Sequence, residues 1–68
     1  MELSRESQAR DSVVRIDGTV SKSYIRQTNS RYLEFVINGD SGNYVVVFGS
    51  GGISVLNANG AIVKSIAW

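Results

Sequence analysis

Residues 45–52, VVVFGSGG, run from β-branched side chains into a glycine cluster, as a strand does before a nucleotide-binding loop. A dinucleotide-binding fingerprint needs G-x-G-x-x-G followed by a helix and a second strand, and Ser54 stands where the last glycine belongs. Residues 53–68 contain an Asn59-Gly60 turn signal and leave no room for that helix and strand. The Gly-Lys-Ser/Thr of a P-loop is also missing from the sequence. The cluster therefore predicts a hairpin turn and not a phosphate cradle.

Catalytic side chains are scarce, because the chain contains neither histidine nor cysteine. A nucleophile and its base would have to be serine with lysine or a carboxylate. Glu34 and Asp40 fall on an expected strand and on a loop tip, and Asp11 and Asp17 show no pairing pattern. Scattered carboxylates alone do not make a zinc or copper site. We therefore predict a protein that is not an enzyme and has no metal site and no cofactor.

The length and the net charge of the chain limit the size of the domain and the kinds of partner that it can bind. A chain of 68 residues forms one small domain and hides only about 60% of the surface that its unfolded form exposes. Without disulfides or metals, self-association is the remaining source of stability, so a homodimer or larger assembly is expected. A formal charge of +1 is far below the basic excess of a dedicated duplex-binding domain.

No apolar stretch approaches the about 20 residues of a membrane span, and residues 1–12, MELSRESQARDS, lack the apolar centre of a signal peptide. These features predict a cytoplasmic protein without a membrane partner. The same twelve residues alternate charges of both signs, and a helix there would have almost no face to bury. We expect them to form a flexible or partner-ordered arm, followed by a single all-β domain over residues 13–68.

Hairpin registers can be tested within the all-β domain, because residues that face each other must share a face of the sheet. A four-residue loop over 39–42 pairs apolar residues throughout: Ile37 with Tyr44, Phe35 with Val46, and Leu33 with Phe48. A two-residue turn at Ser50-Gly51 continues that face, since it pairs Phe48 with Ile53 and Val46 with Val55. An Asn59-Gly60 turn of type I′ pairs Leu56 with Val63 and Ile53 with Ile66.

The segment 13–25, VVRIDGTVSKSYI, allows two interpretations. Asp17-Gly18 could turn a hairpin, but that register mixes apolar and polar residues on each face. As one long strand bent at Gly18, the segment puts Val14, Ile16 and Val20 on one side. We prefer the long bent strand. The fold class is then all-β: a five-stranded antiparallel meander, or a small, partly open, OB-like barrel.

The same registers predict a second apolar face, opposite the core face. Its main members are Tyr32, Val36, Val45, Val47, Leu56 and Val63. An antiparallel sheet usually has one polar face, so this pattern favours an interface with a second copy or with a protein partner. The alternative is a sheet that curls so that the first strand or the arm covers part of it. Trp68 ends the last strand and is expected either at a dimer seam or as a plug of the core.

Three segments within residues 14–48, namely VRIDGTV, RYLEFVIN and DSGN with YVVVF, resemble the first three strands of an OB-fold. After Phe48 the likeness ends, because many OB-folds place a helix where this chain has GSGG. The resemblance implies single-stranded nucleic-acid binding, by phosphate contacts and base stacking. The residues that would supply these contacts are Arg15, Lys22, Tyr24, Arg26, Arg31 and Tyr32. Residues 43–68 are also similar to one blade of a β-propeller, which supports the meander alone.

These features together predict a non-enzymatic binding protein that acts stoichiometrically on a larger macromolecule, as an inhibitor or adaptor does. Phage-encoded counter-defence proteins are often built this way, an analogy without a motif behind it. The alternative function is the nucleic-acid binding that the OB-like segments imply. A small ligand held at a subunit seam is a third function that the sequence leaves open.

Overall fold

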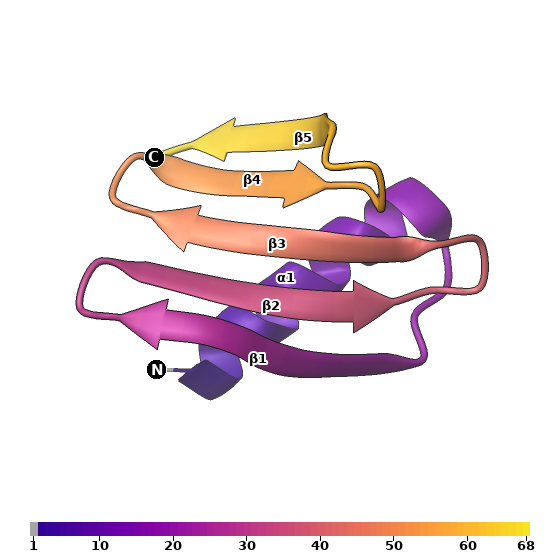
Figure 1. The fold of residues 1–68 in the computed structure, drawn as a ribbon, viewed down its shortest axis with the longest axis horizontal. Coiled ribbons are helices and arrows are strands. Elements are labelled where there is room, and N and C mark those ends of the chain that lie inside the picture. The colour runs from indigo at the N-terminus through magenta and orange to yellow at the C-terminus, as the bar shows by residue number, and fades with distance from the viewer. Residues whose placement is uncertain (1) are drawn as a thin grey trace.

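The structure, a computed structural model, describes residues 2–68 and the side chains of residues 4–68. One helix, α1 (Glu2–Asp17), precedes five strands: β1 (Lys22–Asn29), β2 (Tyr32–Asn38), β3 (Asn43–Gly49), β4 (Gly52–Leu56) and β5 (Ile62–Ala67). The strands form one antiparallel sheet in the order β1-β2-β3-β4-β5, and α1 crosses behind it (Figure 1). The predicted five-stranded meander is confirmed. The sheet is open, with β1 and β5 at its edges, so the OB-like barrel does not form.

The central registers follow the prediction. In the β2–β3 hairpin Phe35 faces Val46, and in the β3–β4 hairpin Gly49 faces Gly52 across a two-residue turn. GSGG is therefore a hairpin. In the β4–β5 hairpin Ile53 faces Ile66 as expected.

The expected pairing of Leu56 with Val63 is wrong, because Leu56 faces Ile62 and Val63 is the extra residue of a bulge. A type I′ turn needs positive φ angles at both central residues, and Asn59 does not have one. The chain instead closes a wider loop, in which the N–H of Asn57 donates to the carbonyl of Ala61 over 2.9 Å. This wider loop shifts the pairing next to it by one residue.

The long bent strand over residues 13–25 is also wrong. Residues 13–17 are the last turn of α1, and the strand begins only at Lys22. Gly18 ends the helix with φ +90°, and its N–H donates to the carbonyl of Val14 over 2.7 Å. The boundary expected after residue 12 thus falls inside α1, which also holds residues 2–12 of the predicted arm; Met1 lies outside the described residues.

One face of the sheet carries the core, and α1 covers it. Ala9 and Val13 on the helix pack with alternate residues of β2, β3 and β4. The buried set is Ala9, Val13, Leu33, Phe35, Ile37, Val46, Phe48, Ile53 and Val55. The rings of Phe35 and Phe48 meet edge to face, with their centroids 5.9 Å apart.

A polar contact fixes the helix to β1. Arg10 donates to Ser23 Oγ over 2.9 Å, and Ser23 in turn donates to Glu6 over 2.5 Å. Glu6, Arg10, Ala9 and Val13 recur at spacings of three and four, which puts them on one side of the helix. Within residues 2–68 no helix combines the length and the apolar character that crossing a bilayer requires.

Candidate functional site: the open face of the sheet

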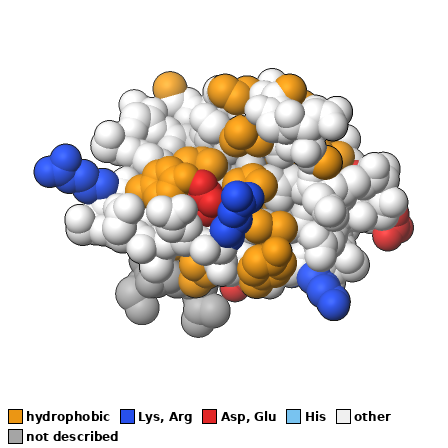
Figure 2. Space-filling model, in the orientation of Figure 1, with side chains coloured by type: hydrophobic (Ala, Val, Ile, Leu, Met, Phe, Trp, Pro, Cys, Tyr) orange, Lys and Arg blue, Asp and Glu red, His pale blue; other side chains and the backbone are white. Residues whose placement is uncertain are grey.

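The sheet face opposite α1, here called the open face, is covered by no other element of residues 2–68. Strand alternation and register place a set of apolar and aromatic side chains on it: Tyr24, Tyr32, Val36, Val45, Val47, Leu56 and, opposite Leu56 on β5, Ile62. Figure 2 shows this side of the molecule, with hydrophobic side chains gathered around adjacent cationic and acidic groups. Five of these residues, namely Tyr32, Val36, Val45, Val47 and Leu56, are residues that the sequence predicts for an interface.

A hollow of about 560 Å³ lies on the open face. Val36, Val45, Val47 and Leu56 line it together with Tyr32. The loop after β4, with Asn57 and Ala58, closes one end. The face is therefore concave as well as apolar, a shape that suits an inserted side chain of a partner.

Arg26 and Glu34 are the charged side chains that line this hollow. Arg26 Nε lies 3.4 Å from Glu34 Oε1. Arg26 is the extra residue of a β1 bulge, between Ile25 and Gln27, which leaves it without a partner in the β1–β2 register. The Glu34 side chain is only 13% exposed, and its Oε1 atom accepts no hydrogen bond from the described residues. The pair is thus an ion pair whose acidic member keeps an unused acceptor.

Tyr32 completes this polar cluster by donating its hydroxyl hydrogen to Glu34 Oε2. The pKa of Tyr32 is raised above its usual value of 10.0, first because the hydrogen bond to Glu34 holds the phenol proton. Desolvation and the negative charge of Glu34 raise this pKa further, while the charge of Arg26 lowers it. The cluster offers hydrogen bonds and charge but no nucleophile–base pair.

Two predicted interface residues lie away from the centre of the open face. Val63 sits in the bulge of the edge strand β5 and is 43% exposed. Trp68 stands beside Phe48 of the core, with ring centroids 6.4 Å apart, and its indole N–H donates to the carbonyl of Gly49 over 3.2 Å. Trp68 therefore extends the rim of the core at one end of the sheet, although its side chain remains exposed.

The residues that the OB-like resemblance implied for nucleic-acid binding are spread over the molecule. Arg15 is on α1, Lys22 begins β1, and Arg31 is in the β1–β2 turn. Tyr24, Arg26 and Tyr32 share one side of the sheet, and Arg26 there is paired with Glu34. The VRIDGTV motif carries the last turn of α1 and the link to β1, so it supplies no bent first strand.

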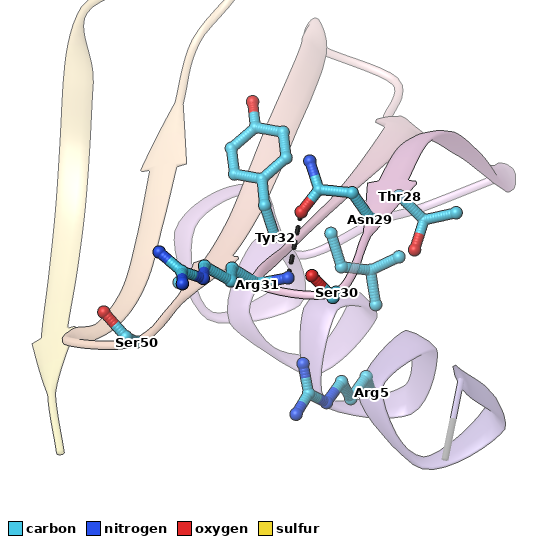
Figure 3. A pocket seen from close by; sticks show the side chains of 9 residues that line it. Arg5, Thr28, Asn29, Ser30, Arg31, Tyr32 and Ser50 are labelled. Atoms are coloured by element: carbon cyan, nitrogen blue, oxygen red, sulfur yellow. Dashed lines mark hydrogen bonds between the residues drawn. The ribbon is translucent and has the colours of Figure 1, made fainter.

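A second hollow, of about 440 Å³, was not anticipated from the sequence. It lies at the end of the sheet where the β1–β2 and β3–β4 turns meet the first turns of α1 (Figures 1 and 3). We call it the end hollow; its lining is Arg5, Thr28, Asn29, Ser30, Arg31, Tyr32, Leu33, Gly49 and Ser50. Arg5 was missed because the segment that carries it was expected to be an arm.

Comparisons of the chain with protein-family models, with curated proteins and with solved structures give no match.

Proposed function

We propose that this chain is a non-enzymatic, cytoplasmic binding protein that acts stoichiometrically on a larger macromolecule, and that its open face is the interface with a second copy of the chain. The observation that carries the proposal is the contrast between the two sides of the sheet. One side is filled by α1, whereas the other presents Val36, Val45, Val47 and Leu56 around a hollow without any covering element from residues 2–68. Apolar sheet faces of this kind are stabilised by packing against another sheet.

The charges of the open face favour a second copy over an unrelated partner. A two-fold dimer brings the same surface patch from both chains together, so the patch must complement itself. Arg26 and Glu34 meet this condition, because a two-fold axis close to them would set each Arg26 near the other chain's Glu34.

Packing of two open faces would give a β-sandwich with both helices outside. The helices, the sheet ends and Trp68 would remain accessible in such a dimer. These are the surfaces with which an inhibitor or adaptor could bind a larger macromolecule.

The test is the solution mass, measured by light scattering coupled to size exclusion, of the wild type and Val47→Asp. We expect the wild type at twice the 7.4 kDa chain mass and Val47→Asp at the chain mass, with unchanged circular dichroism. Val14→Asp is the matched control, since Val14 is an exposed valine on α1, away from the open face. An apolar interface should persist in high salt, because screening weakens charge pairs and not hydrophobic contact.

Two outcomes would contradict the proposal. A wild type that stays monomeric at high protein concentration would leave the open face without its second copy. A complex with a mixed-sequence single-stranded oligonucleotide that forms at low salt and dissociates at high salt would favour the nucleic-acid alternative.

A further inference from the structure

We propose that the end hollow binds the phosphoryl group of a small phosphomonoester. This site lies at the end of the sheet and shares Tyr32 with the open face, but its existence does not depend on the proposed dimer. The two arginines of the hollow come from different elements, Arg5 from α1 and Arg31 from the β1–β2 turn (Figure 3).

The lining chemistry fits a phosphate dianion. The lining residues include two guanidinium groups and the hydroxyls of Thr28, Ser30 and Ser50, and they include no aspartate or glutamate. Guanidinium groups bind phosphate oxygens with paired, charge-assisted hydrogen bonds, and hydroxyls can donate to the remaining oxygens. The hollow can therefore supply donors to a phosphoryl group without a competing carboxylate in its wall.

Within the described side chains, neither arginine has a carboxylate partner, which leaves both available for a ligand. Among the side chains of residues 4–68 the one ion pair joins Arg26 to Glu34, so neither Arg5 nor Arg31 is neutralised by a described carboxylate. The positive charge of two arginines at one end of a small protein attracts anions when no carboxylate neutralises it. The positive end of the α1 dipole adds to this field, since Arg5 stands in the first turns of the helix.

Arg5 is anchored through its side chain, whereas Arg31 is positioned only through the backbone of its turn. Arg5 Cζ lies 5.7 Å from the centroid of the Phe48 ring, so a cation–π contact holds the guanidinium beside the rim of the core. The backbone N–H of Arg31 donates to Asn29 Oδ1 over 2.9 Å, the contact drawn as a dashed line in Figure 3, and this fixes the turn that carries Arg31. Because the Arg5 guanidinium and the turn of Arg31 are already held in place, less conformational entropy is lost when a ligand binds.

The size of the hollow leaves room for an organic ester group beside the phosphoryl group. A volume of about 440 Å³ lies within the range of about 300–1,000 Å³ that is usual for small-molecule sites. Leu33 is buried in the core, so among these lining residues the apolar contact for a short organic group falls to Tyr32. A small phosphorylated metabolite matches both the polar and the apolar part.

The test is a titration of the wild-type protein with glycerol phosphate, followed through its backbone amide resonances. We expect saturable shifts concentrated at Ser30, Arg31, Gly49 and Ser50. Arg31→Ala should raise the dissociation constant about tenfold or more, the effect of losing charge-assisted hydrogen bonds. Arg5→Lys, which keeps the charge but loses the paired donors, should weaken binding as well. Arg15→Ala, which removes an exposed charge from the same helix, should leave the dissociation constant unchanged within about twofold.

Three further arms of the experiment distinguish a phosphomonoester site from the dimer surface, from a free-phosphate site and from diffuse attraction of anions. Val47→Asp should bind glycerol phosphate as the wild type does, even if it abolishes self-association, so the two proposals can fail independently. Inorganic phosphate should bind more weakly than the ester, and equal affinity would overturn the assignment to an ester. Shifts spread over all cationic residues, an equal effect of Arg15→Ala, or preferential binding of an oligonucleotide would each overturn the site.

Discussion

Tyr32 and Glu34, two residues apart on β2, are joined by a hydrogen bond from the tyrosine hydroxyl to Glu34 Oε2. Side chains two apart on a strand point to the same face, so the bond lies on the open face of the sheet. It places a polar cluster, completed by Arg26, within a surface that is otherwise built from valine and leucine. A cluster of this kind can fix the register of a partner sheet while the apolar residues supply the area.

The hydrogen bond predicts an elevated tyrosine titration. One of the three tyrosines should ionise above the usual pKa of 10.0, because ionisation of Tyr32 breaks its bond to Glu34. Ultraviolet absorbance of tyrosinate against pH should show this high step, which Tyr32→Phe removes and Glu34→Gln moves down toward 10.0. Since the folded-state pKa is the higher one, the stabilising contribution is complete below pH 10.0 and is lost as pH rises through the folded-state value. A high step that survives Tyr32→Phe would contradict the assignment.

Gly52 should be intolerant of substitution, whereas Gly51 should not. Gly52 has φ +146°, and an added Cβ would lie 2.0 Å from the carbonyl oxygen of Ile66 on the neighbouring strand. Gly52→Ala must therefore displace β5 from β4, at a cost of more than about 2 kcal/mol in the free energy of unfolding. At Gly51 an added Cβ meets no atom within 4 Å, so Gly51→Ala should change that free energy by less than about 0.5 kcal/mol. Chemical denaturation of the two variants makes the comparison, and equal midpoints would contradict this account of the β4–β5 edge.

A charge should lower the free energy of unfolding strongly at one of two adjacent valines on α1 and hardly at all at the other. Val13 is fully buried against the sheet, whereas Val14 is 41% exposed. Val13→Asp should lower the free energy of unfolding by more than about 3 kcal/mol, because it buries an unpaired carboxylate. Val14→Asp should stay within about 0.5 kcal/mol of the wild type. The bent strand expected from the sequence has Val14 on an apolar side, so a larger effect at Val14 than at Val13 would restore that interpretation.

The meander could be predicted from the sequence because its signals are local. Alternation in YLEFVI and NYVVVF identifies the faces, and the spacing between these runs fixes the loop 39–42 and hence the register. The open face followed from the same alternation, so five of its residues could be named in advance. Here local pattern and tertiary structure agree.

The helix could not be predicted by the same reasoning, because Ala9 and Val13 give it only a narrow apolar stripe. Two signals were present: acid-to-base pairs at a spacing of four, Glu6 with Arg10 and Asp11 with Arg15, and Gly18 as a helix stop. The end hollow depends on Arg5, whose position follows from the docking of this helix, so no pattern along the chain reveals it.

The loop between β4 and β5 should depend on Asn57 more than on Asn59. The sequence pattern predicts a turn centred on Asn59-Gly60. In the structure, however, Asn57 Oδ1 accepts hydrogen bonds from the N–H of Asn59, over 3.0 Å, and from the N–H of Ala61, over 3.1 Å. Asn57→Ala removes both acceptor contacts and should lower the free energy of unfolding by about 1 kcal/mol or more. Asn59→Ala should cost less than about 0.5 kcal/mol, since φ of Asn59 is not positive and alanine can adopt it. Denaturation midpoints of the two variants decide the matter: a greater loss at Asn59 would support the tight type I′ turn, and with it the pairing of Leu56 with Val63, over the bulged register.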